Sequence, residues 1–182
     1  HGLYGFIGTS QTTRFNDVGA DPDYSDQPTE ERFTFSASNT YPSAVTYIQQ
    51  RRAFANSNDE PEKVWLSQTG KFKNFTYRAP IQDDDAASFT IAGRQVNAVK
   101  HMLDVGQFLV FTTGGEWAIR GDSAGIITPL QINAKQYSYN GSSDLAPLVV
   151  GNNALYVQAR GAIVRDFTFD IAVDGYRGND LT

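Results

Sequence analysis

Short runs of apolar residues alternating with polar ones dominate the chain from about Arg32 onward. The runs are rich in Val, Ile, Thr, Phe and Tyr, and clusters of Gly, Asn, Asp and Ser separate them. This is the pattern of short β-strands joined by turns. No segment keeps a 3.6-residue period over the length of a helix, and the best helical candidate, 44–52, reads equally well as a strand and a turn. We therefore predict an all-β domain over 32–182.

Residues 1–31 have a different pattern. Gly and Pro punctuate this part, aspartates concentrate toward its end, and the only apolar run is a candidate lone strand at 3–7. We interpret 1–31 as an irregular linker or the remnant of a preceding domain. Because the chain starts at His1 and ends without a capping element, we expect it to be a piece of a longer protein, truncated at the C-terminus.

The strand pattern repeats three times. Each unit reads as strand, tight turn, strand, a turn containing Gly, Asn or Pro, and a further strand, and the units recur at about 50 residues. Trp65 and Trp117 fall at similar places in the first two units. The predicted strands are 44–48, 52–55 and 64–67; 98–103, 108–111 and 116–119; and 147–150, 154–157 and 162–165.

Two architectures fit this repeat. Three or four short antiparallel strands at this spacing are typical of β-propeller blades, and about three units would make an incomplete propeller, because closed rings have four to eight blades. The alternative is an ordinary β-sandwich or meander, whose hairpins also repeat loosely. The sequence pattern leaves both open.

Composition removes several classes of function. The chain has 182 residues, no cysteine and two histidines, and its 20 acidic and 15 basic residues give a net charge of −5. Disulfides, thiolate metal sites and cysteine nucleophiles are excluded, and the acidity argues against binding by neutralising phosphates. No apolar run is long enough to cross a bilayer.

The candidate catalytic residues have simpler structural explanations. His101 falls at a core-facing or cross-strand position, and no Gly-x-Ser-x-Gly motif accompanies it, so we interpret it as structural. Gly114 and Gly115 resemble a hairpin turn rather than a phosphate loop, since no lysine follows at the required spacing.

Two acidic runs invite a metal hypothesis. Asp21, Asp23 and Asp26 provide oxygens as a calcium loop would, but the sixth position lacks glycine and Arg32 stands at the twelfth, so we favour a solvated loop. Asp83, Asp84 and Asp85 are contiguous, and we predict a turn in which they accept hydrogen bonds from local backbone N–H groups.

Two further motifs are read as structural. Residues 57–61 resemble the Asp-box turn of sialidase-like propellers, although Trp65 lies further along the chain than the tryptophan of that motif. The Asp-box is itself a structural turn and not an active site. Arg51 and Arg52 could bind a carboxylate or phosphate. We favour one buried ion-pair partner and one solvated neighbour. We expect no catalytic residue, metal or cofactor.

Several segments, taken in order, resemble the tail nozzle, or tail tubular protein B, family of short-tailed bacteriophages and prophages. The resemblance covers roughly 16–182, and residues 1–15 fit it poorly. The segments that carry it are 41–45, 49–55, 64–75, 82–86, 112–117 and 175–181.

The resemblance implies a virion structural protein without enzymatic activity. Members of that family resemble elongated subunits built around an imperfect β-propeller, which assemble as a hexamer with adaptor and other tail proteins. The implied location is the virion tail, after synthesis in the bacterial cytoplasm. DNA would pass through the channel without specific binding, which a net acidic wall allows. We expect this piece by itself to be monomeric.

Two alternatives from other classes remain. A propeller or sandwich module could bind host-surface glycan, and an exposed aromatic platform beside Asp and Asn would favour that function. A sialidase-like or other glycoside hydrolase ranks third, because it needs two carboxylates facing each other across a cleft.

Overall fold

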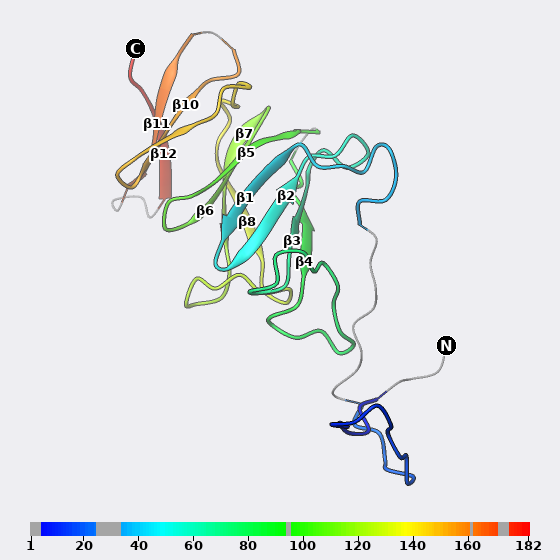
Figure 1. The fold of residues 1–182 in the computed structure, drawn as a ribbon. Coiled ribbons are helices and arrows are strands. Elements are labelled where there is room, and N and C mark those ends of the chain that lie inside the picture. Colours follow the sequence, from blue (N-terminus) through cyan, green and yellow to red (C-terminus); the bar gives the residue numbers. More distant parts are fainter. Residues whose placement is uncertain (1–4, 25–33, 94–95, 161, 171–174) are drawn as a thin grey trace.

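The computed structural model describes residues 5–24, 34–93, 96–160, 162–170 and 175–182. Within these ranges the protein is all-β, with three antiparallel sheets of four strands each (Figure 1). The first sheet contains β1 (Ala44–Ile48), β2 (Arg51–Ala55), β3 (Lys63–Leu66) and β4 (Ala87–Thr90). The second contains β5 (Val99–Asp104), β6 (Phe108–Thr112), β7 (Gly115–Arg120) and β8 (Asn133–Ser138). The third contains β9 (Leu148–Val150), β10 (Asn153–Val157), β11 (Val164–Asp170) and β12 (Gly175–Asp180).

Each sheet is a meander in which consecutive strands pair. The strand orders are β1-β2-β3-β4, β5-β6-β7-β8 and β12-β11-β10-β9. Each sheet contains the three predicted strands of one unit, with bounds within two residues of those predicted for all but the last strand of the third unit. That strand starts at Val164 and continues to Asp170. Each sheet also has a fourth strand, β4, β8 or β12, that the predicted units did not include.

The second sheet lies between the other two, and its strands show why. Side chains on successive residues of a strand point to opposite faces. Phe108 and Val110 of β6 join a core with the first sheet, whereas Leu109 and Phe111 join a core with the third. Every residue of β6 is buried. The unbroken apolar run 108–111 thus reflects a strand covered on both faces.

The sheets approach each other at different strands. β1 lies beside β5, the first strands of their sheets, whereas the second and third sheets approach through β8 and β12. The structure shows three stacked sheets, and a propeller arrangement of these repeats stays a prediction. The 44–52 segment, the helical candidate, forms β1, a turn and the start of β2.

The turn between β1 and β2 has an unusual backbone. Gln49 and Gln50 both have positive φ, 44° and 59°, as a two-residue type I′ hairpin turn requires. The side chain of Gln49 then reaches the loop after β7, where Nε2 donates to the Gly125 carbonyl at 2.8 Å and Oε1 accepts from the Ile127 amide at 2.9 Å. This turn therefore fixes the first sheet to the second.

Residues 5–24 lie apart from the three sheets (Figure 1). Their only strand-like pairing is an isolated bridge between Phe6 and Asp23, in which each amide donates to the other carbonyl. The candidate strand at 3–7 is thus a single bridge in its described part. Residues 1–4 and 25–31 of the predicted linker lie outside the described residues.

Candidate functional site

A cleft of about 630 Å³ opens where turns and loops of all three sheets meet. Its lining comes from the β1–β2 and β5–β6 turns, the end of β7 and the loop after it, and the third sheet. Its volume falls within the range of small-molecule sites. The residues that line it are Gln49, Val105, Gly106, Gln107, Phe108, Ile119, Arg120, Asp122, Ser123, Gly125, Asn152, Phe169 and Tyr176.

Aromatic rings form the third-sheet side of the cleft. The ring of Tyr176 stacks on Phe167 at 5.0 Å between centroids and 14° between planes, which holds it in place. Phe169 meets Tyr176 edge to face at 5.3 Å and is 39% exposed. Because Phe169 has a rigid neighbour on one side and solvent on the other, it offers a preorganised apolar surface.

Arg120 is the single cation among the described lining residues. It ends β7 and lies on the strand face that packs on the third sheet, since Ala118, two residues earlier, joins that core. Its positive charge acts to lower the pKa of Tyr176, although burial of the hydroxyl has the larger effect and raises that pKa. Within the described part of the chain, the half-buried guanidinium makes no hydrogen bond or ion pair.

The loop after β7 is held by its own aspartate. Oδ1 of Asp122 accepts the amides of Ala124 and Ile126 at 2.9 and 2.8 Å. Together with the two hydrogen bonds from Gln49, this fixes the loop that contributes Asp122, Ser123 and Gly125 to the lining of the cleft. The polar lining is thus partly structural, and the side chains of Gln107, Ser123 and Asn152 make no hydrogen bond with described residues.

A buried carboxyl lies at the other end of the same interface. Glu116 of β7 is fully buried, and the Ser138 hydroxyl donates to its Oε2. The Tyr156 hydroxyl and the Asn140 backbone amide face the carboxyl. Among the described residues, no donor lies at hydrogen-bonding distance and angle from its Oε1. Burial raises the pKa of Glu116, and the surrounding donors and Arg165 only partly offset this.

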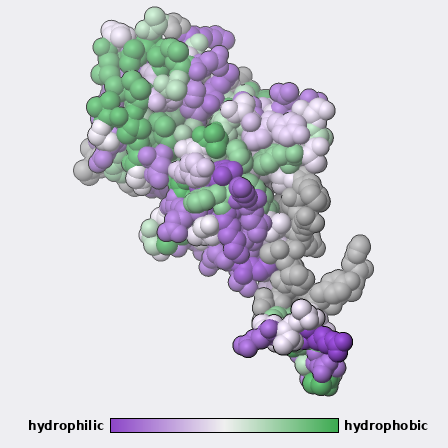
Figure 2. Space-filling view, viewed as in Figure 1, coloured by the Kyte–Doolittle hydropathy of each residue, from purple (hydrophilic) through white to green (hydrophobic). Residues whose placement is uncertain are grey.

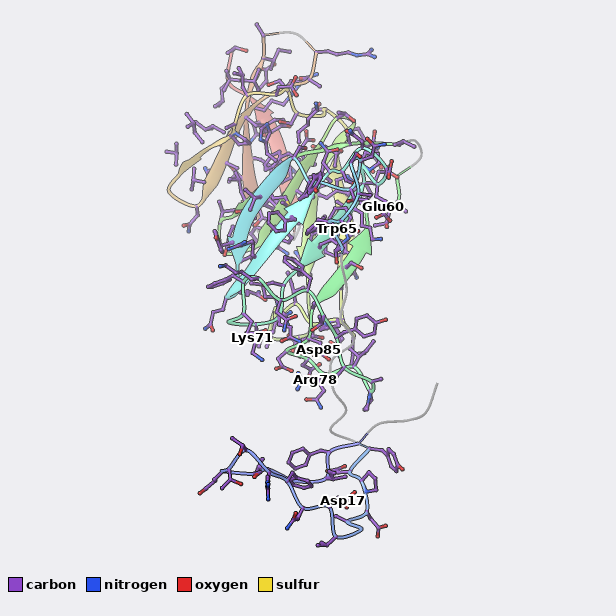
Figure 3. All side chains as sticks on the ribbon, turned by 45° about the vertical axis from the view of Figure 1, so that its right-hand side comes forward. Asp17, Glu60, Trp65, Lys71, Arg78 and Asp85 are labelled. Atoms are coloured by element: carbon purple, nitrogen blue, oxygen red, sulfur yellow. The ribbon has the colours of Figure 1, made fainter. Side chains whose placement is uncertain are left out.

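A second polar cluster fixes the loop between β3 and β4 (Figure 3). The carboxylate of Asp85 is fully buried and accepts hydrogen bonds from the Gln82 and Arg78 amides and the Arg78 guanidinium. Burial acts to raise the pKa of Asp85, but these hydrogen bonds and the Arg78 charge outweigh it and hold that pKa below its usual value. Asp85 therefore behaves as the predicted turn residue, accepting local backbone amides, whereas the Asp84 carboxylate pairs with the Arg78 guanidinium instead.

The prediction for the arginine pair is confirmed for the burial of one arginine, but it is wrong for the ion pair and for the solvated neighbour. Arg51 is only 3% exposed, but its guanidinium donates to the backbone carbonyls of Ser67, Asp83 and Asp85 instead of a carboxylate. Arg52 is half-buried rather than solvated, with its guanidinium 5.7 Å from the ring centroids of both Tyr47 and Phe54. Arginine carries five N–H donors in a planar fork, so the carbonyls of a nearby loop can satisfy its hydrogen bonds without a carboxylate.

The other singled-out residues have structural positions. His101 lies in β5, and its Nε2 is 3.1 Å from the Ser143 carbonyl. Gly114 lies in the turn between β6 and β7, and Gly115 begins β7. In the 57–61 turn, the buried Ser57 hydroxyl accepts the Glu60 amide. None of these residues lines the cleft.

The sequence reasoning did not single out Arg120, Phe169 or Glu116 as site residues. The alternation of side chains along β7 could have indicated Glu116 and Arg120, because both share a strand face with Ala118. This pattern points to a site only once it is known that another sheet covers that face.

The described residues contain no cluster of three or more metal-ligating side chains. Asp26, part of the candidate calcium loop, lies outside them. In the same ranges we find no helix with the length and hydrophobicity needed to span a membrane.

Comparison of the sequence with models of known protein families gives no match. Comparison with curated proteins likewise finds no significant relative.

Proposed function

We propose that the chain is part of a tail nozzle subunit of a short-tailed bacteriophage or prophage, and that it acts by assembly rather than catalysis. The ordered resemblance of six segments supports this function, and a rigid all-β body suits a conduit. One structural observation carries it furthest. The outer face of the third sheet is apolar along β9 and β10, and no described residue packs over that part as a further layer. Along β11 and β12 the same face carries the polar residues Asp166, Thr168 and Arg177.

The strand register defines that outer face. Leu148 pairs with Leu155, and Val157 pairs with Val164, so these side chains share the face opposite Phe167 and the second-sheet core. Leu148 is 66% and Val150 is 56% exposed. Figure 2 shows hydrophobic residues gathered over the end of the molecule formed by the third sheet. Exposed apolar patches of this kind mark protein contacts.

The outer face of the first sheet, at the opposite end of the stack, is partly covered. The ring of Phe35 packs edge to face on Phe54 and Trp65, at 5.3 and 5.4 Å, and Phe75 lies 5.7 Å from Phe35. The chain thus covers part of the outer face of its first sheet with its own aromatic side chains. The stack is open to continuation at the third sheet, where we expect a further β-sheet of the tail assembly to pack.

The remaining elements of the proposal follow from the family resemblance. The assembled form would be a hexamer with adaptor and other tail proteins around a DNA channel. The net charge of −5 is compatible with DNA passing without binding. The isolated chain should stay monomeric in the absence of the other tail proteins. A stable hexamer of the chain by light scattering would contradict that expectation.

The decisive experiment places the protein in or out of virions. Particles from an induced lysate are purified, and tail proteins are identified by mass spectrometry and by an antibody against this chain. We expect its peptides in the tail fraction and label at the tail tip. In complementation, the double substitution Leu148→Lys and Val150→Lys should block incorporation, whereas Val18→Lys, at a residue 90% exposed in the N-terminal segment, should not. Particles that lack the protein would refute the proposal.

The second candidate is binding of a host-surface glycan. The observation that favours it is the cleft, where the exposed Phe169 lies in the same lining as Asn152 and Asp122. Asp122 is the single carboxylate among the described lining residues. Since glycoside hydrolysis requires a pair, this lining favours binding over hydrolysis.

A further inference from the structure

We propose that the cleft binds a carboxylated saccharide, with Arg120 holding the carboxylate and Phe169 the apolar face of the sugar ring. This inference specifies the ligand of the second candidate function and rests on it. It does not require the assembly role.

The argument starts from the charge of Arg120. A guanidinium stays protonated at all physiological pH values. Arg120 is partly withdrawn from water, yet no described residue pairs with it. A partly desolvated charge without a partner is unfavourable, and a carboxylate is the anion whose two oxygens match the guanidinium fork. Asp122 does not fill this role, because no ion pair or hydrogen bond joins it to Arg120, and its Oδ1 accepts two loop amides instead.

The charge inventory limits the size of the anion. The described lining holds one cation and one carboxylate, so it has no means to neutralise a polyphosphate or a nucleic acid backbone. The net charge of −5 adds repulsion against any polyanion. The cleft can therefore accommodate a ligand that carries one negative charge.

The aromatic wall indicates what carries that charge. A pyranose ring has an apolar face of C–H groups and a polar rim of hydroxyls. Phe169 presents an exposed ring fixed against Tyr176, which suits such a face. Asn152, Gln107 and Ser123 supply donors and acceptors that no described residue uses, and these suit hydroxyls. A volume of about 630 Å³ has room for a short acidic saccharide.

The test compares two saccharides that differ in one group. Isothermal titration and amide-shift NMR are carried out with a glucuronic-acid-containing disaccharide and with its neutral glucose counterpart. We expect the acidic sugar to bind about tenfold or more tightly than the neutral one, as charge-assisted hydrogen bonds to a guanidinium would give. Shifts should concentrate at the amides of Gly106, Arg120, Ser123 and Asn152.

Three variants locate the effect. Arg120→Gln should remove the preference for the acidic sugar, and Phe169→Ala should weaken both sugars by a similar factor. Arg160→Gln is the matched control: it removes the same charge from an exposed residue in the loop after β10 that does not line the cleft, and it should change neither affinity. Thermal unfolding of each variant verifies that it is folded. If Arg120→Gln does not fold, Arg120→Lys and the wild-type shift map decide the question.

Equal affinity for both sugars would overturn the inference, as would absence of binding by the folded wild-type protein or an acidic preference that survives in Arg120→Gln. Incorporation of Arg120→Gln into virions tests the assembly role separately. If the protein enters virions but binds neither sugar, only the ligand proposal is refuted. If it binds the acidic sugar but never enters virions, only the tail proposal is refuted.

Discussion

Glu116 and Arg120 stand on the same face of β7, four residues apart, and that face packs on the third sheet. Glu116 is buried against Tyr156 and Ser138 at one end of the interface, and Arg120 lines the cleft at the other. The interface between the second and third sheets therefore has an ionisable group at each end with an apolar core between. We expect the protonation state of Glu116 to control stability at the first end, and a ligand bound to Arg120 to act at the second.

The buried carboxyl should make stability depend on pH. Because the folded-state pKa of Glu116 is raised, its protonated form favours folding, and this contribution is lost as pH rises from about the ordinary value of 4.5 through the raised one. Glu116→Gln should therefore raise Tm above that range, by about 2–4 °C for each kcal/mol gained. Below pH 4.5 the two proteins should converge.

Thermal unfolding across pH measures this difference. Glu60→Gln serves as the control, because Glu60 is half exposed in an ion pair with Lys63 and should contribute about 1 kcal/mol or less at any pH. A Glu116→Gln variant that is less stable than the wild type at high pH would show that the ionised carboxylate is fully accommodated.

The hydroxyl of Tyr156 should be energetically coupled to Glu116. This hydroxyl acts to lower the pKa of Glu116, while burial first and the Glu116 charge second raise the pKa of Tyr156. Tyr156→Phe should thus cost more in the wild-type background than in the Glu116→Gln background, since a hydrogen bond to a charged group is the stronger one. A double-mutant cycle at mildly alkaline pH should give a coupling of about 1 kcal/mol. Strict additivity would contradict the contact.

Acid should weaken the protein through Asp85. Its folded-state pKa is lowered, so its contribution to stability is present above the ordinary value of 3.8 and is lost as pH falls through the lowered one. Asp85→Asn removes the ion pair with Arg78 and leaves buried donors unsatisfied, with an expected cost of about 2–4 kcal/mol near neutral pH.

Urea unfolding at neutral and at acidic pH checks the Asp85 prediction. The gap between the wild type and Asp85→Asn should narrow at acidic pH, when the wild-type carboxylate is protonated as well. Asp83→Asn is the matched control, because the hydrogen bond to Arg51 comes from the backbone carbonyl of Asp83, and its carboxylate has the smallest of the three charge effects on the Arg51 pKa. A gap that does not change with pH would place the effect in packing rather than in charge.

The strands were predictable because their signals are local. The run 108–111 and the alternation around Ala53 follow directly from burial on two faces or on one. Turn residues with positive φ, such as Gly106 and Gly151, mark the hairpins at fixed offsets. The all-β class could therefore be predicted and is confirmed, as are the first three strands of each unit in chain order, whereas the fourth strand of each sheet was not part of the predicted units.

The cleft could not be predicted, because it depends on contacts between distant segments. Gln49 reaches Gly125 and Ile127, and β8 lies beside β12. Nothing in the pattern near Arg120 indicates that Phe169 shares its cleft. The arginine pair failed for a related reason: whether Arg51 meets a carboxylate or a carbonyl depends on the path of the loop between β3 and β4. The resemblance to tail nozzle proteins stays a prediction.

In the β1–β2 turn, glycine substitutions at the two adjacent positive-φ residues should have opposite effects on stability. Gln49 and Gln50 both adopt positive φ, which is unfavourable for residues with a Cβ, by about 1–2 kcal/mol each. Gln50 is exposed and has no side-chain hydrogen bond with described residues, so Gln50→Gly should relieve strain and raise stability by about 0.5–1 kcal/mol after the entropy cost of glycine. Gln49→Gly relieves the same strain but loses the bonds to Gly125 and Ile127, so it should destabilise. Chemical unfolding of both variants, with Gln50→Ala as a strain-retaining control, measures the contrast. If the two glycine variants behaved alike, the Gln49 side chain would have no part in joining the first two sheets, and the wall of the cleft would have to be held by the loop of Asp122.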